Sequence, residues 1–394
     1  LSKLAAAGGS LLYSTYLGGH DDQVGLAVAV DTNENAYITG DTMSTDFPIK
    51  SAYQGVSGGT YTNGVTPLDL FVAKFNTKLS GNSSLLYSTY LGGTDDEAGQ
   101  GIAADNAGNA YVTGYSYSTN YPTRPNGVST QITYVADVVI SKLGPAGTNL
   151  LYSTYIGGDG NDIAQALALD GSGRVYLTGQ TDSTNFPVTA SACQPNHSGG
   201  FENVFLLKLD LSVTGTNAIL YSTYLGGNND NNQDIGLGVA VTSNGFAYVA
   251  GATGSTDFPT TAGSFQQGFG GGFVDGFVAK FDPRDSTPPA TLRKRLLDLA
   301  DRRRAREIVR RRWGGSRSTR AGELQRECGY DRWHQRREGS IRADGRKHRR
   351  TPDQERQGRH VTPAPRRRQL EAGRAGEGRR RQWHRGHRHL RCHP

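Results

Sequence analysis

Residues 11–19 read Leu-Leu-Tyr-Ser-Thr-Tyr-Leu-Gly-Gly, and this stretch decides the fold because it returns three more times along the chain. The later copies begin at Leu85, Leu150 and Ile219, and Ile156 replaces Leu in the third copy. Recurrence at intervals of about 70 residues is the signature of a repeat architecture. The chain of 394 residues is therefore predicted to contain several copies of one small structural unit.

Each copy continues with the same succession of segments. An apolar run is followed by a polar turn, a Tyr-x-Thr-Gly segment, a Ser-Thr-Asp/Asn-aromatic-Pro segment, a variable loop and a Lys-bearing segment. Short segments rich in Val, Ile, Tyr, Phe and Thr between turn residues are typical of β-strands. Four strands per unit predict a β-propeller, because solenoid repeats usually span about 20–45 residues. The units are placed at about 10–84, 85–149, 150–218 and 219–285.

The apolar run of each unit is expected to form the innermost strand of a blade. One position in this run is always Ala, at Ala29, Ala103, Ala168 and Ala240. The preceding position is larger, as at Val28, so small and large residues alternate. Alternation places the two sets on opposite faces of a strand, and both sets are apolar. We therefore expect both faces to be covered by neighbouring sheets, with the alanines where the sheets converge.

These units resemble the bacterial SBBP repeat, the repeat of seven-bladed β-propellers. The resemblance rests on Tyr-Ser-Thr-Tyr-Leu-Gly-Gly at residues 13–19, on residues 105–114, and on residues 275–280, where Gly276 stands in place of Ala. It covers roughly residues 10–285. It implies a propeller fold and a secreted or surface-attached bacterial protein, and it implies no particular activity. The sequence departs from the family in having four recognisable units where seven are expected.

The count of four leaves two arrangements open. The strand at residues 11–17 could complete the last sheet and close a four-bladed ring, which would leave no free edge. Alternatively, the four blades are a fragment of a larger propeller with open edges. The start at Leu1, without an initiator Met, favours the fragment. No signal peptide is visible in this sequence.

The last part of the chain differs from the repeats in composition. Residues 1–290 carry a net charge of −14 and residues 291–394 one of +21, so the overall +7 describes neither part. The second part has no Phe and few aliphatic residues, too few to offset its chain entropy. We expect residues 286–394 to form a disordered, Arg-rich tail. Part of the repeat motif can be recovered near residue 295 in a neighbouring reading frame, so we hypothesise that the tail is translated out of frame.

Carboxylates follow the Gly-Gly of every unit. Ca²⁺ is bound by six to eight oxygen ligands, so carboxylates repeated at one end of the blades could form a calcium site at the channel mouth. The alternative is that they cap turns and solvate the loop. No other cofactor is predicted. The calcium candidates are Asp22, Asp96, Asp162 and Asp234.

Other polar patterns are assigned structural roles. The stretch at residues 31–35 superficially resembles the start of an EF-hand loop, but a hairpin turn is favoured because the later EF-hand positions do not match. A Lys recurs in the last strand of each unit and is expected on a solvated outer face or edge, although it could meet an acidic ligand. No catalytic residues are identified, because no serine–histidine–aspartate arrangement or phosphate-binding loop is signalled. The recurrent lysines are Lys74, Lys142, Lys208 and Lys280.

These observations favour a non-enzymatic scaffold or binding module, outside the cell or on its surface, that contacts a protein or carbohydrate through its variable loops. The loops are residues 51–68, 124–135, 189–201 and 260–274. One alternative is a polysaccharide-active or other hydrolase or lyase with a site at the channel mouth. Another is nucleic-acid binding through the basic tail, although nucleic acid is not the expected partner. No apolar run is long enough for a membrane span.

Overall fold

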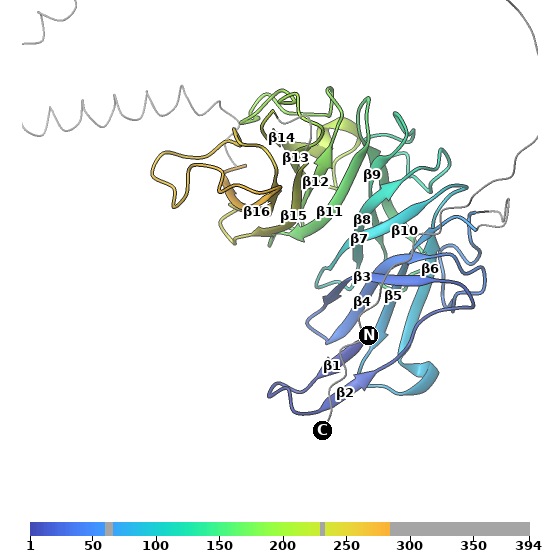
Figure 1. Cartoon of the computed structure of the whole chain (residues 1–394). Coiled ribbons are helices and arrows are strands. Elements are labelled where there is room, and N and C mark those ends of the chain that lie inside the picture. Colours follow the sequence, from blue (N-terminus) through green and yellow to red (C-terminus); the bar gives the residue numbers. More distant parts are fainter. Residues whose placement is uncertain (60–65, 229–232, 284–394) are drawn as a thin grey trace, which may run out of the picture. The chain divides into compact units, whose positions relative to one another are not determined.

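The computed structural model describes residues 1–59, 66–228 and 233–283 (Figure 1). The predicted tail at 286–394 lies outside the described residues, as do the frameshift and nucleic-acid hypotheses that concern it. The regular structure in the described ranges consists of β-strands and two short 3-10 helices, η1 (Gly81–Ser83) and η2 (Gly215–Ala218). None of the helices found there is long and apolar enough to cross a membrane. The predicted all-β fold is confirmed.

The strands form small antiparallel sheets, which are the predicted blades. Blade one contains β3 (Gln23–Val30), β4 (Asn35–Thr42), β5 (Asp69–Asn76) and β6 (Leu85–Leu91). Blade two contains β7 (Glu97–Ala104), β8 (Ala110–Ser116), β9 (Asp137–Leu143) and β10 (Leu150–Ile156). Blade three contains β11 (Asp162–Leu169), β12 (Val175–Thr181), β13 (Asn203–Leu209) and β14 (Ile219–Leu225). Blade four contains β15 (Asp234–Val241), β16 (Ala247–Thr253) and β17 (Asp275–Phe281).

Each complete blade joins two copies of the repeat. Its strands pair in chain order, and the outermost strand is the Tyr-Ser-Thr-Tyr segment of the following copy. The register of this last pairing is the same in each case: Lys74 opposes Tyr87 in blade one, and Lys208 opposes Tyr221 in blade three. Blade four has three strands among the described residues, because no outer strand pairs with β17 there.

The chain begins with a separate hairpin made of β1 (Ser2–Leu4) and β2 (Leu11–Ser14). Its pairing matches the outer two strands of blade two, because Ser2 opposes Ser14 just as Ser141 opposes Ser153. The hairpin is therefore the outer half of a further blade. The closed four-bladed ring considered above is wrong for this structure, since β2 pairs with β1 and not with β17.

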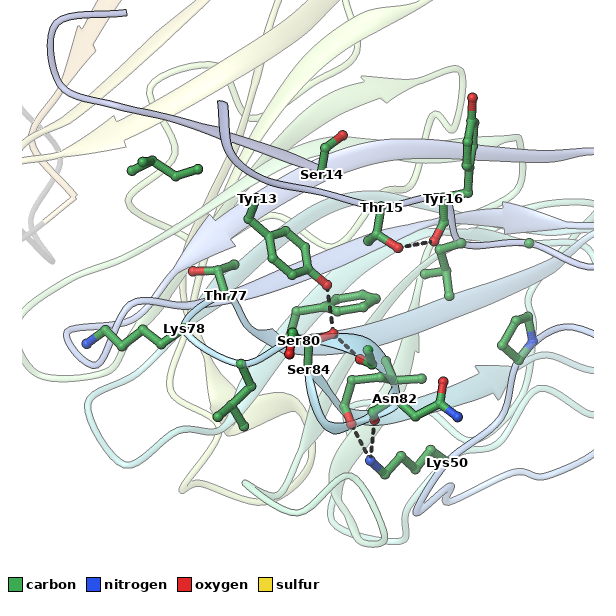
Figure 2. A pocket seen from close by; sticks show the side chains of 18 of the residues that line it. Tyr13, Ser14, Thr15, Tyr16, Lys50, Thr77, Lys78, Ser80, Asn82 and Ser84 are labelled. Atoms are coloured by element: carbon green, nitrogen blue, oxygen red, sulfur yellow. Dashed lines mark hydrogen bonds between the residues drawn. The ribbon is translucent and has the colours of Figure 1, made fainter. Parts of the chain in front are cut away.

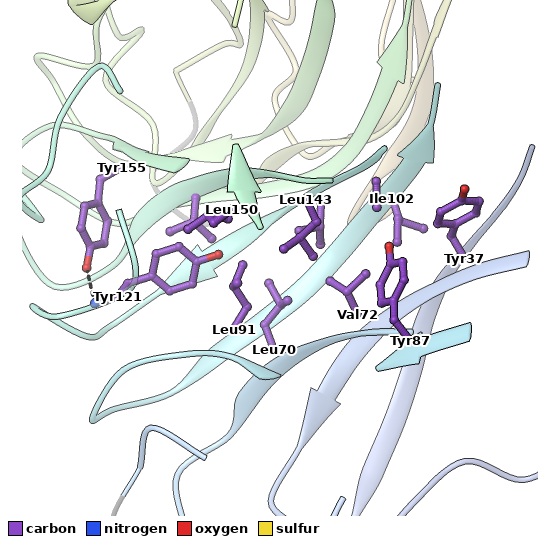
Figure 3. Close-up of a cluster of buried hydrophobic side chains, with 13 residues drawn as sticks. Tyr37, Leu70, Val72, Tyr87, Leu91, Ile102, Tyr121, Leu143, Leu150 and Tyr155 are labelled. Atoms are coloured by element: carbon purple, nitrogen blue, oxygen red, sulfur yellow. Dashed lines mark hydrogen bonds between the residues drawn. The ribbon is translucent and has the colours of Figure 1, made fainter. Parts of the chain in front are cut away.

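Large apolar side chains fill the space between consecutive blades. Contacts join β3 to β7, β7 to β11, and β11 to β15. Figure 3 shows the cluster between the first two blades, to which Tyr37 and Val72 contribute from blade one and Ile102 from blade two. Ala29 packs against this cluster, as expected for the recurrent alanines. Ala240 of β15 is exposed, because no blade follows blade four within the described residues.

The polar stretch at residues 31–35 forms a hairpin turn, as predicted. Asp31 Oδ1 accepts hydrogen bonds from the backbone N–H groups of Asn33 and Asn35, both at 2.9 Å. Its other carboxylate oxygen accepts one from the hydroxyl of Tyr37 at 3.0 Å. An aspartate that binds its own turn in this way stabilises the turn without any metal ion.

The expectation that the recurrent lysines lie on a solvated face or edge is wrong for Lys74 and Lys208, which are buried, whereas Lys280 on the edge strand β17 is exposed. Lys74 is buried, and its Nζ lies 4.8 Å from the centre of the Tyr37 ring. Lys142 lies over Tyr111 at 4.7 Å in blade two. The apolar stem of lysine packs against the sheet while the ammonium group interacts with the ring face, which explains a cation at an otherwise apolar strand position.

The second tyrosine of the Tyr-Ser-Thr-Tyr strand holds the loop that follows the second strand of its blade. Tyr155 donates a hydrogen bond to the Ser118 carbonyl at 2.5 Å and accepts one from the Tyr121 N–H at 2.9 Å. The same two bonds occur around Tyr90 in blade one, with Ser44 and Phe47. Because the ring and hydroxyl are buried, these bonds have no competing water.

We expect Tyr155→Phe to lower the free energy of unfolding by about 2 kcal/mol, because it leaves a buried carbonyl and a buried N–H unpaired. Urea denaturation, followed by far-ultraviolet circular dichroism, measures the free energy of unfolding. Tyr134→Phe is the matched control, since Tyr134 is exposed. Equal stability of the two variants would contradict the role given to the Tyr155 hydroxyl.

Candidate binding site

The four predicted calcium ligands occupy two different kinds of position. Asp22 and Asp96 lie in exposed loops before the first strands of their blades, and Asp96 accepts a hydrogen bond from the Leu68 N–H at 2.8 Å. Asp162 and Asp234 are buried and are the first residues of β11 and β15. The structure therefore does not bring the four residues to one repeated position.

The repeated position belongs to a different set of residues. Gln23 and Glu97 begin β3 and β7, where Asp162 and Asp234 begin β11 and β15. In the ranges that the structure describes, no three His, Cys, Asp or Glu side chains gather as a metal-ion site. Calcium binding by the four candidate residues stays a prediction.

The buried carboxylates at the strand starts hold the Gly-Gly turns. Glu97 accepts hydrogen bonds from the Gly93 N–H at 2.8 Å and from the Ser116 hydroxyl at 2.6 Å. Asp162 accepts them from the Gly158 N–H at 2.7 Å and from the Ser183 hydroxyl at 2.8 Å. Each carboxylate thus links the Gly-Gly turn after the outer strand of one blade to the next blade, at the end of its second strand for Glu97 and in the loop after that strand for Asp162.

A second buried carboxylate faces the same turn from the preceding blade. A Cβ added to Gly92 would meet Glu97 Oε2 at 2.7 Å and would also collide with the carboxylate of Asp69, the first residue of β5. Asp69 accepts a hydrogen bond from the Gly58 N–H at 3.0 Å, but its Oδ1 has no partner within the described residues. The glycine leaves room for two carboxyl groups at the junction between blades.

At the next two junctions two polar side chains again face the first glycine of the Gly-Gly turn, and at the third junction an Asn replaces one Asp. A Cβ on Gly157 would collide with Asp137 and would meet Asp162 Oδ2 at 2.7 Å. At the third junction the residue that corresponds to Asp137 is Asn203, whose Nδ2 would lie 2.6 Å from a Cβ on Gly226. A neutral amide thus replaces one carboxyl group without altering the fold.

Burial makes these carboxyl groups weak acids. It raises the pKa of Asp69 to about 6 and that of Asp162 to about 7. Burial also raises the pKa of Glu97 to about 7, with a further increase from the neighbouring charge of Asp69. With pKa values of about 6 and 7 the groups are partly protonated near neutral pH, which reduces the repulsion between two carboxyl groups at one junction.

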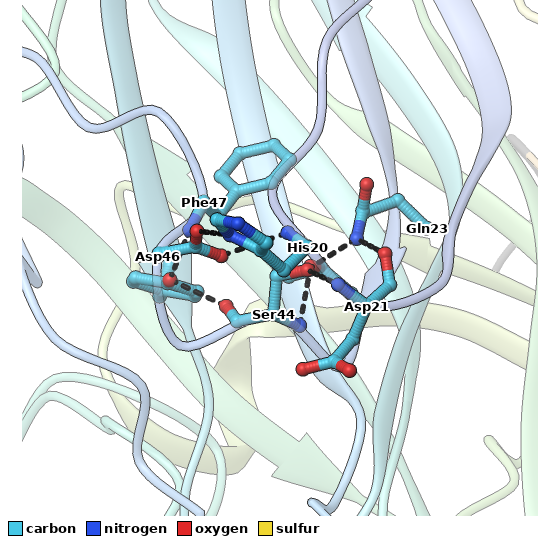
Figure 4. Close-up of polar contacts among 8 residues, drawn as sticks. His20, Asp21, Gln23, Ser44, Asp46 and Phe47 are labelled. Carbon is cyan, nitrogen blue, oxygen red and sulfur yellow. Dashed lines mark hydrogen bonds and ion pairs between the residues drawn. The ribbon is translucent and has the colours of Figure 1, made fainter.

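His20 follows the Gly-Gly turn of the first copy, where the later copies have Thr94, Asp159 and Asn228. Its backbone N–H bonds Asp46 Oδ1 at 2.9 Å, and its ring also bonds the Asp46 carboxylate (Figure 4). The hydrogen bond to Asp46, together with its charge, raises the pKa of His20. The nearby Ser44 hydroxyl accepts from the Asp21 N–H at 2.8 Å, and no bond joins it to His20 among the described residues. This group is an exposed turn contact and does not form a catalytic triad.

A cavity of about 1020 Å³ lies between β2 and the segment that leads from the end of β5 to the start of β6. Figure 2 shows Tyr13 pointing across it, where its hydroxyl lies 2.8 Å from the Ser84 hydroxyl. Two lysines line it, but Lys50 bonds two backbone carbonyls and Lys78 pairs with Glu34 at 3.3 Å. The cavity therefore offers aromatic and hydroxyl groups rather than free charge.

The variable loops are anchored in the same way on each complete blade and differ beyond the anchor. In the first loop, the Gln54 N–H bonds the Thr89 hydroxyl at 2.9 Å, and in the third the Gln194 N–H bonds the Thr223 hydroxyl at 3.0 Å. Each of the four loops exposes at least one aromatic ring on the surface. These rings are Tyr53, Tyr134, Phe201, Phe265 and Phe273.

The sequence did not reveal the anchors or the paired carboxyl groups, although one signal was present. The buried carboxylates Glu97 and Asp162 each stand four residues after the second glycine of the Gly-Gly turn. In the fourth copy three extra residues separate that glycine from Asp234, which hides the equivalence. The loop anchors have no common residue type in all copies, since Ser129 replaces the glutamine in the second loop.

A model of the SBBP beta-propeller repeat matches the chain four times, at residues 12–48, 86–122, 151–187 and 220–259. No curated protein matches the chain. Each matched segment runs from the Tyr-Ser-Thr-Tyr strand to the proline after the second strand of the next blade, which leaves the variable loops outside the match. Fold, register and motif together place this chain in the family of proteins built from SBBP beta-propeller repeats.

Proposed function

We propose that this propeller is a non-enzymatic binding scaffold that acts outside the cell and holds a glycan through its variable loops. The observation that carries the proposal is the composition of those loops. Residues 51–68, 124–135, 189–201 and 260–274 contain no Asp, Glu or Lys, yet each loop exposes an aromatic ring. Exposed rings on a regular scaffold mark interaction sites, and loops whose only formal charge is that of Arg124 suit a neutral polar ligand.

The use of the repeated polar groups supports binding over catalysis. The recurrent aspartate of the hairpin turn, the buried carboxyl groups and the second tyrosine all hydrogen-bond within or between blades. They therefore maintain the scaffold, while the residues that vary between copies lie in the loops. Recognition on a scaffold is normally carried by the loops that it positions.

The extracellular location is part of the same proposal and rests on the resemblance to repeats found in secreted and surface-attached bacterial proteins. A glycan-binding role fits that location because cell-surface and matrix polymers are rich in neutral sugars. The alternative is that the same rings bind a protein ligand. A test with purified polysaccharides distinguishes a glycan ligand from a protein ligand, because no other protein is present in the assay.

We expect at least one neutral polysaccharide in a panel to retard the full chain in affinity gel electrophoresis. The double variant Tyr134→Ala/Phe201→Ala should weaken that retardation about tenfold, since each loses an exposed contact ring. Leu151→Ala is the matched control, because Leu151 is also exposed but lies on β10 outside the loops. The proposal fails if no polysaccharide retards the chain, or if the loop variant and the control behave alike.

A further inference from the structure

Three Tyr-Ser-Thr-Tyr strands of this chain are held on both edges. In blade one, β6 pairs with β5 along one edge. Along its other edge the backbone of Ser88 bonds Lys50 at 2.8 and 3.1 Å, and the Tyr90 N–H bonds the Gln54 carbonyl at 3.2 Å. The variable loop thus forms the second wall of a slot, and the strand fills it. Blades two and three repeat the bond to the serine carbonyl, at Ser153 and Ser222, and the bond from the tyrosine N–H, at Tyr155 and Tyr224.

Aromatic rings form the floor of the slot. In blade one, Phe47 lies 4.7 Å from Phe71 and 5.9 Å from Tyr90, measured between ring centroids. Blade three repeats the trio with Phe186 at 4.9 Å from Phe205 and 6.2 Å from Tyr224. The strand contributes the third ring of each trio, and that ring is buried.

Blade four has the same slot with its strand missing among the described residues. Phe258 and Phe277 form the ring pair at 4.7 Å, as Phe47 and Phe71 do. The loop glutamine is also in place, because Gln266 Nε2 donates to the Gly268 carbonyl at 2.9 Å, the contact that Gln54 makes with Val56 at 3.1 Å.

β2 is a strand of the right sequence that does not fill such a slot. Its Thr15 hydroxyl donates to the Tyr16 carbonyl at 2.9 Å, and the corresponding bond in β6 has the same length. Thr15, the residue after β2, therefore makes the same local bond as its buried counterpart Thr89. However, β1 bonds β2 only as far as Thr15, through Leu1 at 3.0 and 3.1 Å. Tyr16 is fully exposed, whereas the corresponding Tyr90 is buried.

We propose that β2 of a second copy of this chain enters the slot of blade four, with β17 replacing β1 as its neighbour. The register of the complete blades then places Tyr13 opposite Lys280 and Tyr16 opposite Phe277, as Tyr87 and Tyr90 oppose Lys74 and Phe71. Tyr16 completes the aromatic trio. In blade one the ladder runs on to Leu91, which opposes Leu70, so the corresponding Leu17 and Tyr16 gain backbone partners in the slot.

The exposed apolar faces identify the partner as a second copy. Val278 is 77% exposed, while its counterpart Val72 is fully buried; Val28 is 61% exposed, while its counterpart Ile102 is 7% exposed. Val72 and Ile102 belong to one cluster at the junction of blades one and two. Entry of β2 places the blade that follows it against blade four, so Val28 of one copy covers Val278 of the other. Among the described residues of one chain both are exposed, and the contact between copies is head-to-tail.

Disulfide trapping between two single-cysteine chains tests the proposal. The starting full-length chain carries Cys193→Ser, Cys328→Ser and Cys392→Ser; one preparation adds Ser14→Cys and the other Ala279→Cys. The corresponding hydroxyls in blade two, Ser141 and Ser153, lie 2.7 Å apart, so a disulfide fits this pair. We expect oxidation of the mixture to give a cross-linked species of twice the chain mass.

The control replaces Ala279→Cys by Val278→Cys, whose side chain points to the other face of β17, and its cross-link yield should be at least tenfold lower. A synthetic peptide of residues 11–19 in excess should abolish the Ser14–Ala279 cross-link, and the same peptide with Tyr16→Ala should not. The proposal is overturned if the mixture gives no more dimer than the control. It is equally overturned if a chain with both cysteines closes on itself at monomer mass while the mixture stays uncross-linked.

Discussion

Gly179→Ala is expected to lower the free energy of unfolding by about 3 kcal/mol or more. Gly179 is the glycine of the Tyr-x-Thr-Gly segment on β12. A Cβ there would collide with the carbonyl oxygen of Ile163 and lie 2.8 Å from the Cα of Ala164. Both are backbone atoms, so no side-chain rotation can relieve the overlap.

The cause of this close approach is a bulge in the innermost strand. The register of β11 against β12 shifts between Ala164 and Ala166, and the backbone bends toward the glycine at that point. The same shift accompanies Gly40, Gly114 and Gly251 in the other blades. The recurrent glycine is therefore explained by the bulge, and not by a turn or a functional contact.

Gly171→Ala provides the matched control in the same blade. Gly171 lies in the hairpin turn before β12, and no atom lies within 4 Å of the place where its Cβ would be. We expect this variant to unfold at the same urea concentration as the unmodified chain, or to be stabilised by about 0.5 kcal/mol through the less flexible unfolded state. Urea midpoints compare the two variants, and a Gly179→Ala protein as stable as Gly171→Ala would refute the bulge argument.

The repeat predicted much of the fold, because each strand carries its own alternation and its own turns. Strand pairing across the repeat boundary was harder to predict. The segment Ser2–Leu4 matches residues 141–143 in sequence, but this match gains meaning only when the register of β9 and β10 is known. The hairpin of β1 and β2 was therefore not foreseen, and ring closure was considered in its place.

The positions of charged side chains were predicted least well. Lysine in an alternating strand usually indicates a solvated face, yet Lys74 is buried over an aromatic ring that lies on a different strand. The carboxylates Asp69 and Glu97 are 28 residues apart and come from different blades. Their meeting depends on the packing of one sheet against the next, which no local pattern encodes. A carboxyl pair of this kind becomes visible only in three dimensions.

That pair leads to a second large effect, on the pH dependence of stability. In the folded chain burial raises the pKa of Asp69 to about 6 and those of Glu97 and Asp162 to about 7, whereas carboxyl groups in an unfolded chain titrate near pH 4. Between these pH values the folded state binds more protons than the unfolded state. The free energy of unfolding is therefore expected to fall as the pH rises from about 4 to about 7.

The expected loss is on the order of 4 kcal/mol for Asp162 alone, because each unit of pKa corresponds to about 1.4 kcal/mol. Stability from these groups is complete below pH 4 and lost above pH 7. Urea denaturation at a series of pH values measures the slope. A free energy of unfolding that is constant or rises over this range would contradict the assignment of the three carboxyl groups as protonated in the fold.

The third junction shows which substitution tests the contribution of Asp69 to the pH dependence of stability. Asn203 occupies the third junction at the position of Asp69, and its Oδ1 accepts a hydrogen bond from the Ser198 N–H at 2.8 Å, as Asp69 Oδ2 accepts one from Gly58. Asp69→Asn should therefore keep the fold and make the free energy of unfolding less dependent on pH.

We expect Asp69→Asn to be as stable as the unmodified chain at pH 4 and more stable at pH 8, because no charge is then buried beside Glu97. Asp22→Asn, at an exposed carboxylate, should leave the slope unchanged. If Asp69→Asn is less stable at pH 8, the carboxylate of Asp69 stabilises the junction in its charged form and the acid-pair explanation is wrong.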